Sequence, residues 1–182
     1  KAEARKQLGL SLHDVCYLVM GGSMGAGKVK QIVAYLAANR QENEQIIVIC
    51  GNNAALEKSL LNRYGAVPGV TVLGATRQMA LYMYACDLLY SKPGGLTSTE
   101  AAVVGIPLVH TAPIPGCETI NRAFFQKHGM SISAKQAKQQ AALGRRLLHS
   151  PKALHEMKKQ QNAFTYKDSV MKICDLIEEM GR

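Results

Sequence analysis

The sequence contains no tryptophan, and only 5% of its 182 residues are aromatic. Because 47% of the residues are hydrophobic, the chain can still form a sizeable core, built mainly from aliphatic side chains. The basic residues are diluted by Ala, Gln and Leu, and no aromatic stacking motif accompanies them. We therefore expect no nucleic acid among the partners of this protein.

The cysteines lack the spacing of a metal site. They are odd in number, scattered and without a CxxC pair: Cys16, Cys50, Cys86, Cys117 and Cys174. This pattern argues against a zinc site or a disulfide framework. The first three stand in or beside apolar runs, where we expect buried, reduced thiols, which suits a cytosolic protein.

Long apolar runs are also missing. No stretch approaches the ~20 apolar residues that a membrane-spanning helix needs, and no signal-peptide pattern is present. A length of 182 residues fits one domain or one lobe of a larger protein. The first residues, KAEARKQLGL, resemble the end of a helix entered part-way, so we expect the natural chain to begin upstream.

Acidic residues are outnumbered, which gives a formal net charge of +9. From Lys127 onward there are eleven Lys and Arg residues against five Asp and Glu residues. A basic surface favours anionic partners such as phospholipid headgroups or phosphorylated ligands. The alternative is a solvated basic helix face without a partner.

Short apolar runs alternate with amphipathic ones along the chain. The runs predicted as strands are Val15–Met20, Ile46–Cys50, Val70–Leu73, Leu88–Ser91, Leu108–His110 and a short Met130–Ile132. The segments predicted as helices are Ala26–Ala38, Ala54–Tyr64, Arg77–Ala85, Leu96–Val104, Glu118–Lys127, Ala134–Leu148, Pro151–Ala163 and Tyr166–Met180. Ser133 is a plausible N-cap, Pro151 suits a first helical turn and Gly129 suits a helix stop.

This order predicts the fold class. Strands without polar alternation are buried on both faces, as in a parallel sheet, and alternation of strand and helix implies right-handed crossovers. We predict an α/β, Rossmann-like parallel sheet of about six strands with helices on both faces. The core spans about residues 15–132, and a helical tail at 133–182 packs on it or reaches toward a partner lobe.

A glycine-rich turn, GGSMGAG at residues 21–27, follows the first predicted strand. Gly22 to Lys28 fits GxxxxGK, most of a P-loop, in which Lys28 would pair with phosphate. However, Val29 stands where magnesium needs a hydroxyl, and no apolar strand ends in a clear Asp ligand. We favour a simpler hypothesis, in which glycine N–H groups and the Ser23 hydroxyl hold a phosphate. A tight turn without a ligand is the structural alternative.

A second glycine turn, Gly94-Gly95-Leu96-Thr97, opens the helix that carries Glu100. Thr97 and Glu100 also fit a capping box. The rest of that helix is apolar, so we expect an acid on a buried helix that needs a partner, such as two ribose hydroxyls. We favour the ligand role over the cap.

The loop Pro113-Ile-Pro-Gly-Cys-Glu-Thr-Ile-Asn121 then leads into another helix. Glu118 and Asn121 are three residues apart and share one face, where an acid and an amide can bind sugar hydroxyls. The alternative for Glu118 alone is a first-turn acid that interacts with the helix dipole.

Three segments carry a resemblance: GGSMG, KPGGLTSTEAAVVGIPLV and PIPGCETINRAFF. Together they resemble the C-terminal, donor-binding lobe of GT-B glycosyltransferases. The most similar group contains monogalactosyldiacylglycerol synthases and processive diacylglycerol glucosyltransferases, and the peptidoglycan lipid II N-acetylglucosaminyltransferase is a near relative. The similarity covers about Val15 to Gly129.

The resemblance implies a UDP-sugar site. Glu100 would hold the ribose, and the loop Gly74, Ala75 and Thr76 would meet uracil through its backbone. Gly22 and Ser23, with Gly94, Gly95, Leu96 and Thr97, would contact the diphosphate, and Lys92 would belong to the same UDP-sugar site. Gly116, Cys117, Glu118 and Asn121 would face the sugar. No cofactor and no metal is expected in the nucleotide site, because helix N-termini and glycine N–H groups stabilise the leaving UDP.

Two residues depart from the family's pattern. Cys117 stands where lipid glycosyltransferases usually have Gln, and Met24 replaces a polar residue common in the lipid II enzyme, which argues for the diacylglycerol branch. The acceptor lobe with its catalytic base is expected to precede this chain. None of His13, His110, His128, His149 and His155 sits in a motif that would replace that base. His110 is the best placed of them, but we favour a structural role for it.

The resemblance therefore implies a hexosyltransferase. It would transfer a hexose with inversion from a UDP-sugar to a lipid such as diacylglycerol, and this lobe alone would be inactive. The lipid acceptor would bind through the absent N-terminal lobe. An anionic membrane surface is a further candidate partner, with the protein cytoplasmic and peripheral to the inner face of the cell membrane. The alternatives are N-acetylglucosamine transfer in peptidoglycan synthesis, a P-loop nucleotidase and a basic membrane-docking module.

Overall fold

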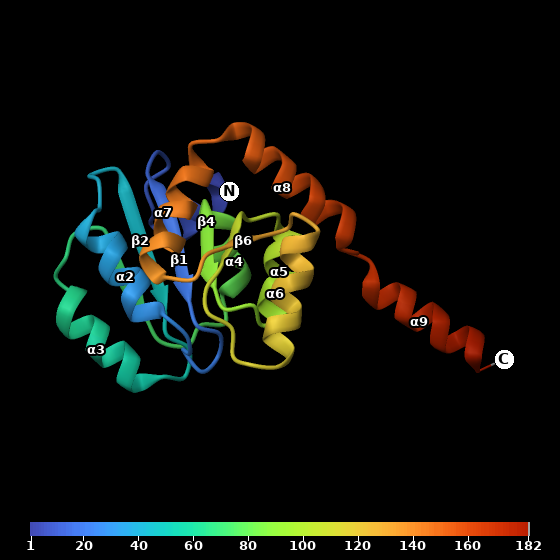
Figure 1. Ribbon diagram of the computed structural model, residues 1–182. Helices are drawn as coiled ribbons and strands as arrows, with labels where there is room; N and C mark the ends of the chain where they lie inside the picture. The colour runs from blue at the N-terminus through green and yellow to red at the C-terminus, as the bar shows by residue number, and fades with distance from the viewer. Residues whose placement is uncertain (182) are drawn as a thin grey trace.

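The computed structural model describes residues 1–181 and contains one parallel, six-stranded sheet (Figure 1). Its strand order is β3-β2-β1-β4-β5-β6, so the chain starts in the middle, winds to one edge and returns to build the other. The strands are β1 (Val15–Met20), β2 (Glu44–Ile49), β3 (Val70–Leu73), β4 (Leu88–Ser91), β5 (Leu108–His110) and β6 (Ile132–Ser133). The predicted Rossmann-like sheet is confirmed.

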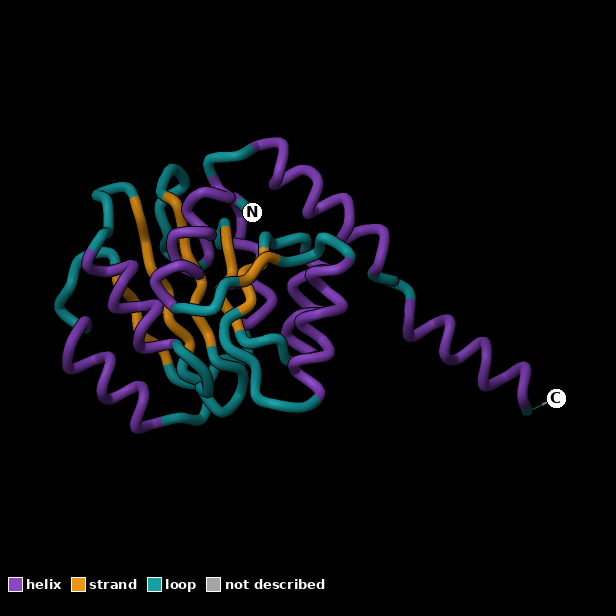
Figure 2. The backbone as a smooth tube through the Cα atoms, in the orientation of Figure 1, coloured by secondary structure: helices purple, strands orange, loops and turns teal. Residues whose placement is uncertain are grey.

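Helices cover both faces of the sheet, as Figures 1 and 2 show. One face packs against α2 (Val29–Ala38), α3 (Ala54–Tyr64) and α7 (Ala137–Leu148). The other packs against α4 (Met79–Ala85), α5 (Gly95–Val104) and α6 (Cys117–Lys127), and the short α1 (Ala2–Gln7) lies against α4. Two buried aliphatic clusters, one on each face, form the core that the composition predicts.

Several predicted boundaries were wrong for identifiable reasons. The helix expected from Ala26 begins at Val29, because Gly25 and Gly27 adopt φ of 57° and 92°, which a right-handed helix cannot include. The helix α4 begins at Met79, two residues after its predicted start at Arg77.

Polar side chains account for the shifted start of β2 and for the place of Ser133. The strand β2 starts at Glu44, a polar residue that is buried because it pairs with Tyr17 and Arg145. Ser133 is not an N-cap: it lies in β6 and its hydroxyl donates to the His110 carbonyl at 2.8 Å, while Gln136 caps α7.

The helical tail divides into a packed part and a projecting part. α8 (Pro151–Phe164) packs against α5 and α7, and its Gln161 amide donates to the carbonyls of Ile106 and Met130. Pro151 occupies the first turn, as predicted, and Gly129 follows the end of α6 with φ of 67°. α9 (Ser169–Met180) has no buried residue and extends away from the domain in Figure 1.

Because α9 buries no side chain, it contributes nothing to the core that holds residues 1–164 together. We expect a chain that ends after Thr165 to keep the melting temperature of the longer chain to within ~1 °C. Differential scanning calorimetry of the two chains measures this. A fall of more than ~4 °C would contradict the independence of α9, since it corresponds to about 1 kcal/mol in a domain of this size.

Candidate functional site

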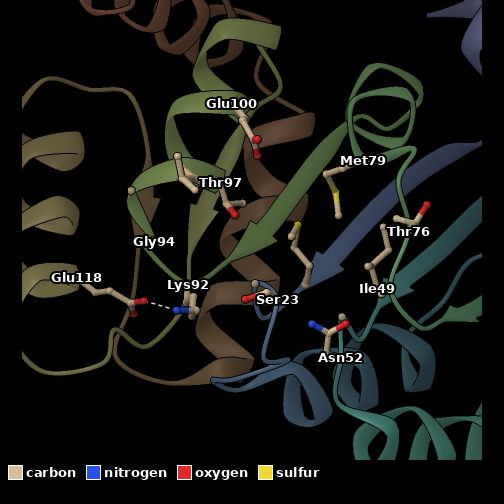
Figure 3. Close-up of a pocket in the computed structure, with 16 residues that line it drawn as sticks. Ser23, Ile49, Asn52, Thr76, Met79, Lys92, Gly94, Thr97, Glu100 and Glu118 are labelled. Atoms are coloured by element: carbon tan, nitrogen blue, oxygen red, sulfur yellow. Dashed lines mark hydrogen bonds and ion pairs between the residues drawn. The ribbon is translucent and has the colours of Figure 1, made fainter.

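A cavity of about 520 Å³ opens at the carboxyl edge of the sheet, where β1, β2, β3 and β4 end (Figure 3). In an open parallel sheet this edge, beside the point where the strand order reverses, is the usual place for a ligand. The residues that line it are Met20, Gly22, Ser23, Ile49, Gly51, Asn52, Ala75, Thr76, Met79, Lys92, Gly94, Gly95, Leu96, Thr97, Glu100 and Glu118.

Gly22 and Ser23, from the turn at residues 21–27, form one wall of the cavity. The backbone of this turn closes on itself, with Ala26 N–H donating to the Gly21 carbonyl at 2.9 Å. A β-carbon on Gly21 would lie 2.2 Å from the Ala26 oxygen, so no other residue fits this turn. The turn also holds the loop after β2, since Asn52 N–H donates to the Ser23 carbonyl at 2.7 Å. The glycines therefore bring backbone, Ser23 and Asn52 to one wall.

The second glycine turn forms the opposite wall. Gly94 is the N-cap of α5 and Gly95 is its first helical residue, without a side chain bonded to the cap. The N–H groups of the first helical turn, whose residues line the cavity, therefore have no capping side chain, and they carry the positive end of the helix dipole. Such a helix start can bind an anion.

Glu100 lies further along α5 and, with Thr97, faces the cavity in Figure 3. Its side chain is exposed, which corrects the prediction that it stands on a buried helix; the buried side of this helix is formed by Ser98, Ala101 and Ala102. The capping-box alternative is also wrong, because the N-cap is Gly94 rather than Thr97. Glu100 is therefore free to bind a ligand hydroxyl.

An ion pair joins the second glycine turn to α6. One oxygen of Glu118 pairs with the Lys92 ammonium, and the other accepts the Ile114 N–H at 2.8 Å. Asn121, one turn further along α6, donates its amide to the Pro93 carbonyl at 3.1 Å. The shared face predicted for Glu118 and Asn121 therefore points at residues 92–95.

Comparison with known proteins identifies the family. Residues 3–164 match the family of glycosyl transferases group 1. The chain belongs to this family. It is 32% identical, over 98% of its length, to a processive diacylglycerol beta-glucosyltransferase of Bacillus pumilus. It is 34% identical, over 79% of its length, to monogalactosyldiacylglycerol synthase 3 of Arabidopsis thaliana.

The fold of this glycosyltransferase chain has a match among solved structures. MurG of Acinetobacter baumannii superposes with a TM-score of 0.71 and 22% identity, over 97% of this chain and 53% of MurG. The chain covers 47% of the Bacillus relative and 32% of the Arabidopsis one. It therefore spans less than half the length of these curated relatives.

Most residues that line the cavity belong to the segments that carry the glycosyltransferase resemblance or were predicted from it. Of the residues predicted to bind UDP-sugar, four lie outside the cavity lining: Gly74, Gly116, Cys117 and Asn121. Gly74 packs on Glu57, whose carboxylate is 2.8 Å from the position of a β-carbon there. Gly116 is the N-cap of α6, Cys117 is exposed, and Asn121 supports the turn at Pro93.

Five residues that line the cavity were not predicted from the sequence: Met20, Ile49, Gly51, Asn52 and Met79. Met20 and Ile49 are the last residues of β1 and β2, and nothing in an apolar run marks a final residue as part of a cavity wall. Gly51 and Asn52 directly follow a predicted strand, so the rule that ligands bind at carboxyl ends could have found them.

The P-loop hypothesis finds no support in this site. The Lys28 ammonium donates to the Lys135 carbonyl at 3.2 Å, and Lys28 is not among the cavity-lining residues. Gly25 and Gly27 instead line a separate hollow with Lys30 and Asn53. Within residues 1–181, no cluster of three or more His, Cys, Asp or Glu side chains is arranged to hold a metal ion. Over the same residues, no helix combines the length and apolar character needed to cross a membrane.

His110 has the structural role that we favoured. It is fully buried at the end of β5, and its two ring nitrogens lie 3.0 Å from the hydroxyls of Ser98 and Ser131. This contact ties α5 to the segment before β6. Burial, aided by the nearby Arg122 charge, lowers the pKa of His110 from 6.5 to about 4. Cys16, Cys50 and Cys86 are buried free thiols, as predicted.

The lowered pKa of His110 predicts how stability depends on pH. Between pH 6.5 and 4 the unfolded chain binds a proton that the folded chain does not, so stability is lost as the pH falls. We expect the free energy of unfolding to drop by about 1 kcal/mol from this residue between pH 7 and pH 5.5. In His110→Gln that portion of the pH dependence should be absent, as measured by urea unfolding at both pH values. An equal drop in the variant would assign the effect to other groups.

Proposed function

We propose that this chain is the UDP-sugar-binding lobe of an inverting glycosyltransferase that transfers a hexose to a lipid acceptor such as diacylglycerol. The observation that carries the proposal is the convergence on one cavity of two glycine turns, the second of which opens α5, with Glu100 in the cavity wall. Backbone N–H groups and a helix N-terminus suit a diphosphate, and a carboxylate suits a ribose diol.

The chemistry assigned to this lobe is stabilisation of the leaving group. A hydroxyl of the acceptor attacks the anomeric carbon of the sugar, and the bond from that carbon to the diphosphate oxygen breaks. The electron pair stays with UDP, where the start of α5, the glycine N–H groups and Lys92 oppose the developing negative charge. This requires no metal ion in the nucleotide site.

The base that takes the acceptor proton is assigned to the part of the protein outside these 182 residues. The cavity-lining residues include no histidine, and His110 is buried between two serines. We therefore expect this chain alone to bind UDP and to glycosylate no lipid. The acceptor would bind to an N-terminal lobe that faces the cavity.

The lipid acceptor is favoured by the names of the relatives. The two relatives with identities of 32% and 34% are named for glycosylation of diacylglycerol, whereas MurG, at 22%, supports the fold alone. N-acetylglucosamine transfer to a peptidoglycan precursor, the alternative that the sequence resemblance implies, is the second candidate. A lipid acceptor places the protein at a membrane surface. Exposed basic residues on α7 and α8 would attract anionic headgroups, for example Lys138, Arg146, Lys152 and Lys159. The protein would then bind peripherally to the cytoplasmic face of the membrane.

Calorimetric titration of the chain with UDP and with ATP, each with and without Mg²⁺, tests the donor assignment. We expect micromolar to millimolar affinity for UDP that is independent of Mg²⁺, and no binding of ATP. ATP binding that depends on Mg²⁺ would instead restore the P-loop hypothesis. Binding to anionic vesicles without affinity for either nucleotide would favour a docking module.

A further inference from the structure

The ion pair between Lys92 and Glu118 belongs to the interior of the cavity wall. The side chains are only 16% and 8% exposed, and Figure 3 shows them facing each other at the cavity's edge. Lys92 stands at the end of β4 and Glu118 in the first turn of α6. The pair therefore connects two segments that are 26 residues apart in the chain.

The Lys92 ammonium lies where the two glycine turns approach each other. A β-carbon on Gly22 would lie 2.9 Å from the Lys92 Cε atom. A β-carbon on Gly94 would lie 3.9 Å from the Lys92 Nζ atom and 3.8 Å from the Glu118 Oε1 atom. An anion held by both turns would therefore contact Lys92 and come close to the Glu118 carboxylate.

Before a ligand binds, the side-chain charges that line this part of the cavity disfavour an anion. Lys92 is the only cationic side chain among the cavity-lining residues, and Glu100 and Glu118 are both acidic. Glu118 has two other stabilising contacts, the Ile114 N–H at 2.8 Å and the start of α6. These contacts offset part of the cost of giving up Lys92, because the Glu118 carboxylate keeps other partners when the ammonium moves.

We propose that Lys92 exchanges partners when the nucleotide binds: its ammonium leaves Glu118 and pairs with the diphosphate. Glu118 is then a positioning residue that holds Lys92 in place in the free protein and lowers the affinity for the diphosphate by competing for it. This inference rests on the proposed function, because it takes the diphosphate to be that of UDP.

A double-mutant cycle tests the exchange, with UDP titrated calorimetrically into the wild-type chain, E118Q, K92M and the double variant. We expect E118Q to bind UDP about tenfold more tightly, since the Lys92 ammonium no longer has to leave an ion pair before it pairs with the diphosphate. K92M should bind at least about tenfold more weakly. In the K92M background the gain from E118Q should shrink to less than about threefold. UMP, which lacks the second phosphate, should gain less than UDP from E118Q.

Two controls separate this exchange from a change in folding. Glu156→Gln removes an equal charge from α8, outside the cavity lining, and should leave UDP affinity unchanged. K92M leaves Glu118 buried without its cation and should lower the melting temperature, which the double variant should recover.

Weaker UDP binding by E118Q, or a gain that persists without Lys92, would overturn the exchange while the donor assignment stands. If the wild-type chain bound no UDP, both the proposed function and this inference would be wrong. The two failures are therefore distinguishable.

Discussion

Replacing Gly21 with alanine is expected to weaken UDP binding by more than about a hundredfold and to destabilise the fold by about 2 kcal/mol. The reason is space: the new β-carbon would stand 2.2 Å from the Ala26 oxygen and 2.5 Å from the Ala26 nitrogen. These are backbone atoms, so the turn must open, and the N–H groups proposed to hold the diphosphate would lose their arrangement. Calorimetry with UDP and urea unfolding measure the two effects.

Gly105→Ala is the matched control for this substitution. Gly105 ends α5 in a left-handed conformation with φ of 77°, and no atom lies within 4 Å of a β-carbon there. Alanine should cost about 1 kcal/mol of stability through backbone strain and leave UDP affinity unchanged. If Gly21→Ala behaved like Gly105→Ala, the glycine turn would have no part in the nucleotide site.

Glu100→Ala is expected to lower UDP affinity by at least about 2 kcal/mol, or roughly thirtyfold, because ribose hydroxyls lose a charged partner. Stability should change by less than about 0.5 kcal/mol, because Glu100 is exposed and does not cap α5. Calorimetric titration of UDP and urea unfolding of the variant and the wild-type chain measure the two effects.

A ligand without ribose hydroxyls provides the control for Glu100. The 2′,3′-dideoxy analogue of UDP should bind the wild-type chain and Glu100→Ala with the same affinity. If the variant lost affinity for the analogue as much as for UDP, Glu100 would act on another part of the nucleotide, and the ribose assignment would be wrong.

The sheet was predictable from the sequence because most of its strands are short apolar runs, and the central strands β1, β2, β4 and β5 are buried on both faces. Four strands were placed to the residue: Val15–Met20, Val70–Leu73, Leu88–Ser91 and Leu108–His110. Boundaries failed where a polar residue joins an element through a distant partner, as Glu44 does with Arg145, 101 residues away. A pattern within a short window cannot contain such a partner.

The same limit explains the errors within the site. Glycine turns and the acid on α5 are local patterns, so the sequence located most of the cavity. The ion pair of Lys92 and Glu118 depends on how α6 packs beside the end of β4, which no spacing reveals. The expected burial of Glu100 was wrong because its apolar neighbours in sequence face the sheet, whereas its own side chain faces the cavity.

A crystal structure of the chain with UDP bound tests the account most directly. The account predicts UDP in the cavity at the carboxyl edge of the sheet, with ribose hydroxyls within hydrogen-bond distance of Glu100. The diphosphate should lie between the turn at Gly22 and the start of α5. UDP bound in another hollow, or in this cavity with its ribose away from Glu100 and its phosphates in solvent, would contradict the donor-lobe assignment.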